Sequence, residues 1–407
     1  MNNSIDIKDI IEHKRIQTHF QPIVSMKKSS IIGFEALSRS YVEGKEKFIS
    51  PLELFSLAAE NNLTVELDRL CRELSLKNFR KDPFTNKDML LFLNFETSII
   101  DRGVVGSGHL INMVNELQID PGHIVIEINE SRVINTDELI KFVKTYREYG
   151  FLIAIDDLGS GFSNLNRIPI LKPDIIKIHR TMIENINKEY YISEVYNSLL
   201  SLSRKIGAIV IAEGVETDEE LMKVIEFGTD MIQGYYFLKP AKLSNNGIKE
   251  CIEKLTKAST RFKNSVVNKI NKKVYFDQRY KMVIESFLNK VKNTNEEDLD
   301  NTLKELLTSD QNIECIYILD TSGIQQTNTI LTGSNKKSGL FKPAMAGEDH
   351  SLKDYFLFVA AGAERFITDP YISMATGNLC ITFAIAYVNI YHKKYILCID
   401  IRPDFLF

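Results

Sequence analysis

The chain has 407 residues, a formal net charge of −4, an apolar fraction of 44% and a charged fraction of 26%. These values are ordinary for a globular protein. The small net charge does not indicate binding to a nucleic-acid polymer or to a membrane surface. The polar N-terminus lacks the apolar core of a signal peptide, and no apolar run is long enough to span a bilayer. Scattered cysteines without a CxxC pair are typical of reduced core residues. We therefore expect a soluble cytoplasmic protein.

The N-terminal part of the chain predicts two strands followed by two helices. The strands cover residues 17–24 and 30–38 and are separated by a polar turn. Ser50 is placed to cap a helix that begins at Pro51, and a second helix is expected over residues 65–79.

From residue 89 onward, short apolar strands alternate with helices. The strands are expected over residues 89–95, 123–129, 151–157, 174–180, 208–214 and 231–237. Near-continuous apolar runs of this length are typical of buried parallel strands. With the first two strands they make eight, which favours a TIM-like (β/α)8 barrel in an α/β domain over residues 1–257. No Gly-x-Gly-x-x-Gly follows the early strands, which disfavours a dinucleotide-binding sheet.

The remaining chain predicts a linker and a second domain. Residues 258–294 form the expected linker, a long basic helix or helix pair in which a solvated connector is favoured over a nucleic-acid contact. Residues 295–407 read as strands joined by turns with helical segments between them, which predicts an α+β domain with an antiparallel sheet.

Polar residues lie at the carboxyl ends of the predicted barrel strands, where the active sites of such barrels are found. They are Glu35, Asn94, Glu127, Asp156, Asp157, Lys177, Glu213 and Gln233. Asp156 and Asp157 are adjacent, so each raises the pKa of the other unless a cation lies between them. Taken alone, this pair could also be a solvated strand end beside a glycine turn. The whole set of oxygen donors without a His/Cys cluster favours Mg²⁺, Mn²⁺ or Ca²⁺ over zinc, and its size favours two ions.

These residues resemble the motifs of the EAL-domain proteins, which hydrolyse the bacterial messenger cyclic di-GMP. The resemblance covers about residues 15–257 and follows the family order: Gln21-Pro22, Glu35-Ala36-Leu37, Asn94, Glu127 to Glu130, Asp156-Asp157, Lys177, Glu213 and Gln233-Gly234. It implies a cyclic di-GMP phosphodiesterase that opens the ring to linear pGpG.

The resemblance also implies a role for each matching residue. The implied metal ligands, for Mg²⁺ or Mn²⁺ with Ca²⁺ bound and inhibitory, are Glu35, Asn94, Glu127, Asp156 and Asp157. The implied catalytic residues are Lys177, Glu35 and Glu213. The implied contacts to cyclic di-GMP come from Gln21, Leu37, Arg39, Asp156, Lys177, Glu213 and Gln233. Glu130 corresponds to the residue that anchors the loop after the paired aspartates.

Two departures from the family pattern keep a second hypothesis open. The loop reads DDLGSGFSNL where the family prefers DDFGTGYSSL, so Leu158, Ser160, Phe162 and Asn164 are all substitutions. His179 replaces an aspartate of the family's KID motif. If the aspartate at this position holds Lys177 by charge pairing, its replacement would misplace the lysine, and a misplacement of about 1 Å costs roughly 10²-fold in rate. The chain would then be a slow enzyme or a cyclic di-GMP receptor without turnover, and a barrel for another phosphoester is a third, more remote alternative.

The C-terminal segment resembles the sensory PAS/Cache-type fold in its pattern of strands and turns. This resemblance implies control of the barrel by a small-molecule ligand that the sequence does not identify. The amphipathic linker and the sensory module both favour a homodimer.

Overall fold

The computed structural model describes residues 6–41, 48–101, 108–129, 135–161, 165–308, 310–332 and 340–402. The chain divides into two compact units, Met1–Ser265 and Val266–Phe407. No helix among the described residues is long and apolar enough to cross a membrane.

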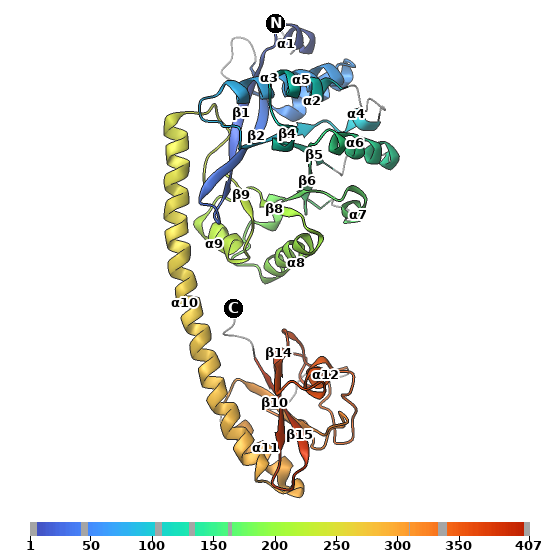
Figure 1. Ribbon diagram of the computed structural model, residues 1–407, viewed down its shortest axis with the longest axis vertical. Coiled ribbons are helices and arrows are strands. Elements are labelled where there is room, and N and C mark those ends of the chain that lie inside the picture. Colours follow the sequence, from blue (N-terminus) through green and yellow to red (C-terminus); the bar gives the residue numbers. More distant parts are fainter. Residues whose placement is uncertain are drawn as a thin grey trace. The chain divides into compact units, whose positions relative to one another are not determined.

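In the described part of the first unit, eight strands close into a barrel surrounded by helices (Figure 1). The strands, in their order around the barrel, are β1 Ile16–Ser25, β9 Met231–Gln233, β8 Ile209–Ala212, β7 Ile175–Ile178, β6 Leu152–Leu158, β5 Ile124–Asn129, β4 Leu90–Phe95 and β2 Ser30–Tyr41. β1 and β2 pair with each other and complete the ring, while the short strand β3 (Phe48–Ile49) extends the other edge of β2. The predicted TIM-like barrel is confirmed.

Strand β1 departs from the expected all-parallel arrangement. It pairs antiparallel with β2 and with β9, whereas the remaining pairs around the barrel are parallel. The reason is the short turn over residues 26–29, because parallel neighbours need a long crossover connection and a turn of this length only allows a hairpin.

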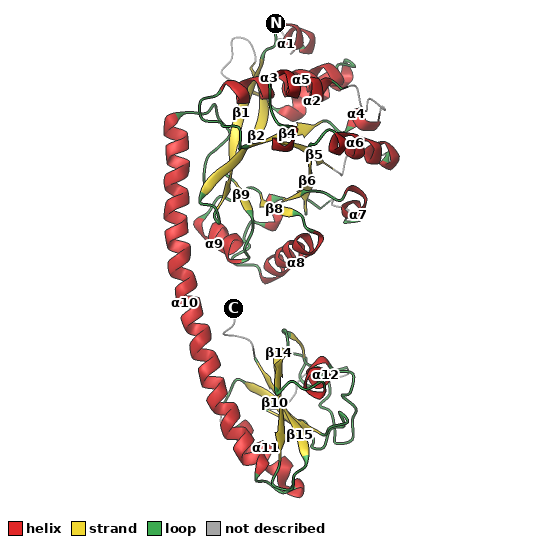
Figure 2. Cartoon of the chain, viewed as in Figure 1, coloured by secondary structure: helices red, strands yellow, loops and turns green. Residues whose placement is uncertain are grey.

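Helices cover the outside of the barrel between its strands (Figure 2). Ser50 accepts a hydrogen bond from the backbone of Glu53 and caps α2 at the predicted residue, with Pro51 in the first turn. The helices of this part are α1 Ile7–Glu12, α2 Pro51–Glu60, α3 Thr64–Lys81, α4 Ser98–Asp101, α5 His109–Glu116, α6 Thr136–Glu148, α7 Arg167–Leu171, α8 Tyr190–Ile206 and α9 Asp218–Glu226.

The barrel interior contains a layer of apolar side chains, one from each of seven strands. The layer consists of Ile23, Phe92, Val125, Ala154, Ile175, Ile211 and Met231. On β2 the corresponding position is Gly33, where a Cβ atom would lie 2.2 Å from the carbonyl oxygen of Leu90. This apolar layer, called the floor below, fills the barrel interior, and it supports the side chains that lie above it.

Helix α10 runs without a break from Asn245 to Lys292. The sequence predicted that the barrel domain ends at residue 257 and that a helical linker follows over residues 258–294, whereas the boundary between the two compact units falls inside this single helix. The three-part division of the chain stays a prediction.

The second unit contains an antiparallel sheet with helices on both faces. Its strands are β10 Ile313–Leu319, β11 Ile330–Leu331, β12 Arg365–Ile367, β13 Tyr371–Ile372, β14 Leu379–Val388 and β15 Lys394–Ile401. Every strand pairing among its described residues is antiparallel. Alternate residues of β10 pack into two clusters, one with α11 (Leu299–Leu307) and one with α12 (Asp354–Ala360). The expected α+β architecture is observed, and the PAS/Cache-like identity stays a prediction.

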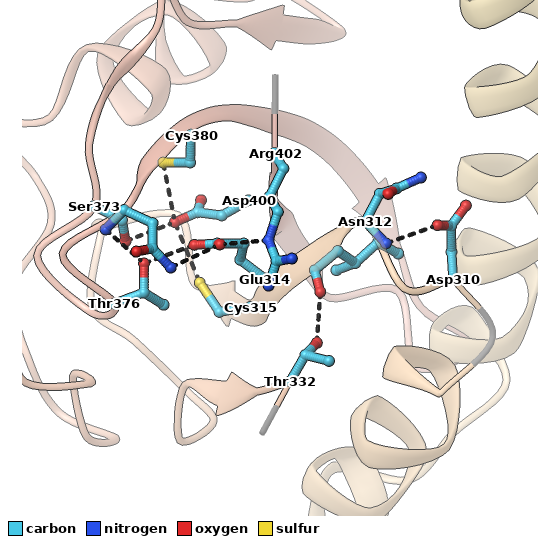
Figure 3. A network of polar contacts seen from close by, with 12 residues as sticks. Asp310, Asn312, Glu314, Cys315, Thr332, Ser373, Thr376, Cys380, Asp400 and Arg402 are labelled. Carbon is cyan, nitrogen blue, oxygen red and sulfur yellow. Dashed lines mark hydrogen bonds and ion pairs between the residues drawn. The ribbon is translucent and has the colours of Figure 1, made fainter. Parts of the chain in front are cut away.

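Two buried carboxylates tie the strands of this sheet together (Figure 3). Asp400 on β15 accepts hydrogen bonds from Thr382 Oγ1 at 2.7 Å and Ser373 Oγ at 3.1 Å, and from the thiol of Cys315 at 3.2 Å. Burial raises the pKa of Asp400 above its usual value, although these donors oppose the shift. Glu314 accepts from Arg402 Nε at 2.7 Å. The cysteines of the chain are buried and form no disulfide, as expected.

Candidate active site

The polar side chains of the site form a layer directly above the apolar floor of the barrel. Side chains alternate along a strand, so a residue two positions beyond a floor residue points into the same interior. Residues two positions beyond the floor on the parallel strands are Asn94, Glu127, Asp156, Lys177, Glu213 and Gln233, and on β2 the residue is Glu35. Because β1 runs the other way, its residue in this layer is Gln21, two positions before Ile23 and opposite Glu35.

Lys177 lies at the centre of this polar layer, with only 1% of its side chain exposed. Its Nζ atom is surrounded by four carboxylates of the described residues. The distances from Nζ are 2.5 Å to Glu127 Oε1, 2.6 Å to Glu213 Oε1, 3.2 Å to Asp156 Oδ1 and 3.5 Å to Glu35 Oε2. One ammonium group therefore faces four acids in a site that water barely reaches.

The electrostatics of the site show an excess of negative charge. Burial, together with the neighbouring charge of Glu35, raises the pKa of Glu127 well above its usual value. Burial is also the main cause of the raised pKa of Asp156 and of Glu213, and Lys177 offsets it only in part. Burial disfavours the charged form of Lys177, but the surrounding acids outweigh it and hold its pKa well above the usual value.

Glu35 is held by amide groups rather than by charge alone. It accepts hydrogen bonds from Asn94 Nδ2 at 2.8 Å and from Gln233 Nε2 at 2.5 Å. Burial opposes its ionisation, but Lys177 and these two amides outweigh burial and lower the pKa of Glu35. Gln233 Nε2 also lies 3.0 Å from Gln21 Oε1, which links the first and last strands of the barrel.

Asp157 adopts a backbone conformation that is uncommon for a residue with a side chain. Its φ angle is +61°, in the left-handed region, and such strain is often found at functional sites. Asn129 Nδ2 donates a hydrogen bond of 2.5 Å to Asp157 Oδ2, and His179 Nε2 lies 3.9 Å from Asp157 Oδ1. The turn thus directs the carboxylate of Asp157 back toward the strand ends.

The donor set fits hard divalent cations. Both carboxylate oxygens of Glu127 and Oδ1 of Asp156 are buried and accept no hydrogen bond from the described residues, although Lys177 lies within ion-pair distance. Asp156, Asp157 and Glu213 offer oxygen atoms that all lie within 4.8 Å of one another. Carboxylate oxygens with free lone pairs in this spacing suit Mg²⁺, Mn²⁺ or Ca²⁺.

Comparison with known families identifies the barrel. Residues 5–240 match the EAL domain family. The chain belongs to this family. The match covers the whole barrel and every strand that contributes to the polar layer.

Several EAL proteins resemble the chain over different parts of its length. YkuI of Bacillus subtilis is 26% identical over 388 residues, which is 90% of both chains. A crystal structure of YkuI with cyclic di-GMP and calcium superposes with a TM-score of 0.78 at 24% identity, covering 98% of this chain and 99% of YkuI. BlrP1 of Klebsiella pneumoniae, in a complex with manganese and cyclic di-GMP, superposes at 28% identity with a TM-score of 0.51 over 56% of each chain. PdeG of Escherichia coli, a probable cyclic di-GMP phosphodiesterase, is 29% identical over 237 residues, which is 58% of this chain and 46% of PdeG.

A cleft of about 450 Å³ opens beside the polar layer of the EAL barrel. Its lining includes Glu35, Asn94, Asp156 and Asp157 from the strand ends, and Leu37 from β2. Arg39 lies two residues beyond Leu37, is half-buried, and donates a hydrogen bond from Nη1 to its neighbour's carbonyl oxygen. The cleft therefore provides space for a ligand directly beside the acidic layer.

The structure brings most of the predicted site residues together. The polar layer and its rim contain Gln21, Glu35, Asn94, Glu127, Asp156, Asp157, Lys177, Glu213 and Gln233. Their individual roles stay predictions. Glu130, the predicted loop anchor, lies outside the described residues, as do Phe162 and Asn164.

The EAL barrel also uses residues that the sequence did not single out. Asn129 holds Asp157, and its position two residues after Glu127 on the same strand was a signal that could have found it. Asp68 and Arg72 on α3 line the cleft as an ion pair. A polar pair four residues apart on a helix is common on surfaces, so its sequence gave no sign of a site.

Proposed function

We propose that the chain binds cyclic di-GMP and, with divalent cations, hydrolyses it to linear pGpG. The observation that carries the proposal is the buried Lys177 within 3.5 Å of four carboxylates at the strand ends. Membership of the EAL family supports the substrate class, as do the relatives that bind cyclic di-GMP.

Glu35, Asn94, Glu127, Asp156 and Asp157 would hold the cations, since Glu127 and Asp156 have free oxygen lone pairs. Bound divalent cations supply charge that stabilises the attacking and leaving oxygens of a phosphoester displacement. They would also remove the repulsion that raises the pKa values of Glu127, Asp156 and Glu213.

The protein's own groups position the reactants. Lys177 Nζ is a fixed hydrogen-bond donor, and four surrounding carboxylates orient it, so it can align the attacking water. Asn94 and Gln233 hold Glu35 in one orientation through amide hydrogen bonds. Leu37 lines the cleft, where the dinucleotide would lie with Arg39 nearby for a phosphate contact.

A receptor without turnover is the second candidate function. The substituted loop after Asp157 favours it. His179 Nδ1 lies 3.1 Å from Thr181 Oγ1, and its other nitrogen faces Asp157 rather than Lys177. The substitution at His179 is therefore weaker support for a receptor than the sequence suggested. Lys177 is held by its carboxylate neighbours, and this supports an enzyme.

Incubation of the full chain with cyclic di-GMP and Mg²⁺ or Mn²⁺ tests the proposal, with pGpG followed by chromatography. We expect product with the wild type and none above background with Asp156→Asn. Tight binding by calorimetry without product over hours would establish the receptor. Absence of both would remove cyclic di-GMP from either role, and a panel of other cyclic phosphoesters would follow.

We also propose that the chain forms a homodimer through α10. Val267, Ile270 and Val274 are 55%, 55% and 47% exposed and follow a spacing of three and four residues, which is typical of a helix–helix seam. Sedimentation should show a dimer at concentrations on the order of tens of micromolar, and Ile270→Lys should shift it to a monomer. A monomeric wild type would contradict the proposal.

Control of the barrel by the C-terminal unit is a further part of this proposal. A cleft of about 420 Å³ between α12 and the sheet, lined by Phe356, Val359 and Tyr395, is a candidate ligand cavity. Val359→Phe would partly fill it. A changed rate of pGpG formation by this variant of the full chain is expected, and an unchanged rate would speak against control through this cavity.

A further inference from the structure

Arg72 on α3 is a buried cation with unused hydrogen-bonding capacity. Only 8% of the residue is exposed, and its Nε and Nη1 atoms have no hydrogen-bond partner among the described residues. A guanidinium group carries five N–H donors, and burying donors without acceptors is costly. The arrangement is therefore incomplete without an acceptor that approaches from the cleft.

The position of Arg72 places it in the same cleft as the strand-end carboxylates. The cleft lining includes Arg72 together with Asn94, Asp156 and Asp157. The guanidinium carbon lies 4.1 Å from the ring centroid of Phe95, the residue directly after Asn94, and this cation–π contact restrains its position. A ligand anchored at the strand ends that extends along the cleft would reach this guanidinium.

The charge of Arg72 is already balanced. Its Nη2 lies 2.5 Å from Asp68 Oδ2, and the Asp68 side chain is only 2% exposed. A phosphate placed against the free side of the guanidinium would meet the nearby carboxylate of Asp68, whereas a neutral acceptor would not. Apolar side chains of Leu52 and Phe55 also line the cleft, which suits the face of a base. These features favour a base edge over a phosphate.

We propose that Arg72 is a specificity-determining residue that donates from Nη1 to the O6/N7 edge of one guanine of the bound cyclic dinucleotide. This inference rests on the proposed function. Guanine presents two acceptors at this edge, whereas adenine presents one acceptor and one donor, so the arrangement selects guanine.

The experiment compares analogues on the full-length wild type by calorimetry in calcium. The probes are cyclic di-GMP, its 7-deazaguanine analogue, which lacks the N7 acceptor, and cyclic di-IMP, which keeps O6 and N7. We expect the 7-deaza analogue to bind about tenfold more weakly than cyclic di-GMP. The affinity for cyclic di-IMP should fall by less than the affinity for the 7-deaza analogue. Chromatography after each titration checks that the ligand is intact.

A variant assigns the effect to Arg72. Removing Arg72 alone would leave the Asp68 charge buried without a partner, so the double variant Asp68→Asn/Arg72→Met is used, with Asp68→Asn as its matched control. In the double variant, cyclic di-GMP and the 7-deaza analogue should bind equally, while the control should keep the difference. If the double variant does not fold, equal binding of cyclic di-GMP and the 7-deaza analogue by the wild type still overturns the role of Arg72.

The outcomes separate this inference from the proposed function. No binding of cyclic di-GMP by the wild type would overturn both. Equal binding of cyclic di-GMP and the 7-deaza analogue by the wild type would overturn the role of Arg72 alone. Equal weakening of both ligands in the double variant, with a reduced dependence on salt, would show a phosphate contact instead and would also overturn it.

Discussion

The Nζ atom of Lys177 lies 2.5 Å from Oε1 of Glu127, and neither side chain is more than 1% exposed. A buried pair of this kind offsets the cost of burying two charges only when both partners are present. Three more carboxylates lie within 3.5 Å of the same ammonium group, so the negative charges outnumber the single positive charge. The fold is thus built around a site whose negative charge exceeds what its own lysine neutralises.

Replacing Lys177 with methionine should destabilise the metal-free protein by about 3 kcal/mol, because it leaves the carboxylates without their buried cation. Divalent ions should restore part of this loss, since they neutralise the same groups. Chemical denaturation with and without Mn²⁺ measures both effects, and pGpG formation should fall by about 10²-fold or more.

Glu127→Gln is the matched control for this prediction. It removes one negative charge while keeping the shape of the side chain, so the metal-free protein should keep or gain stability, by roughly 1 kcal/mol. Equal losses in Lys177→Met and Glu127→Gln would show that packing rather than charge holds the site together.

The buried Asp68 should make stability depend on pH. Burial raises its pKa from 3.8 to about 6, although Arg72 opposes the shift. A carboxyl whose pKa is raised by folding contributes stability below its unfolded pKa and loses it as the pH rises through its folded pKa. Between pH 3.8 and about 6, the wild type should therefore lose about 3 kcal/mol relative to Asp68→Asn.

Denaturant unfolding of the metal-free wild type and of Asp68→Asn across this range measures the difference. Other buried acids titrate in both proteins, so the comparison isolates Asp68. Parallel pH profiles would mean that Asp68 has an ordinary pKa in the folded protein.

The convergence of the strand-end side chains could be predicted from the sequence, because two regular rules of strand geometry apply to them. Side chains alternate along each strand, and the ends of neighbouring parallel strands meet at one rim, so Glu127, Asp156 and Lys177 had to converge if the barrel formed. The reversed direction of β1 was not predicted, but it left the site intact, because Gln21 simply lies before its floor residue instead of after it.

Other parts of the site depend on information that a pattern does not carry. The left-handed backbone of Asp157 is set by the turn that follows it, and its side chain partner Asn129 comes from a different strand. Arg72 could be placed on a helix from the sequence, but which side of α3 faces the cleft depends on how the helix packs against β1, β2 and β4. These features follow from tertiary packing rather than from local periodicity.

Removing the side chain of Asn129 should weaken metal binding. Its amide donates to Asp157 Oδ2, and loss of such a supporting hydrogen bond typically costs 10–100-fold in metal affinity. Calorimetric titration of Asn129→Ala with Mn²⁺ should show this loss. Asn115 on α5 is exposed, so Asn115→Ala should bind Mn²⁺ like the wild type. Unchanged affinity in Asn129→Ala would exclude Asp157 as a ligand that needs this support.

Gly234 follows Gln233, and its lack of a side chain allows the chain to pass close to Val215. A Cβ atom at Gly234 would lie 2.0 Å from the carbonyl oxygen of Val215 and 2.4 Å from its nitrogen. Val215 has little room to move, because its N–H donates to Gln233 and its carbonyl oxygen accepts from Tyr236. Gly234→Ala should therefore cost at least about 3 kcal/mol and should displace the Gln233 amide from Glu35.

Gly247→Ala serves as the control, because the nearest side-chain atoms to its Cβ would belong to Ser244 and Leu238, at 3.3 Å and beyond. Gly247 lies in the first turn of α10, where alanine is the better helix former, so its stability should change by less than about 1 kcal/mol. Thermal unfolding compares the two variants, and calorimetry with cyclic di-GMP reports whether the Gln233 side of the site is intact. A Gly234→Ala protein as stable as Gly247→Ala would mean that the last barrel strand can shift outward without disturbing Glu35.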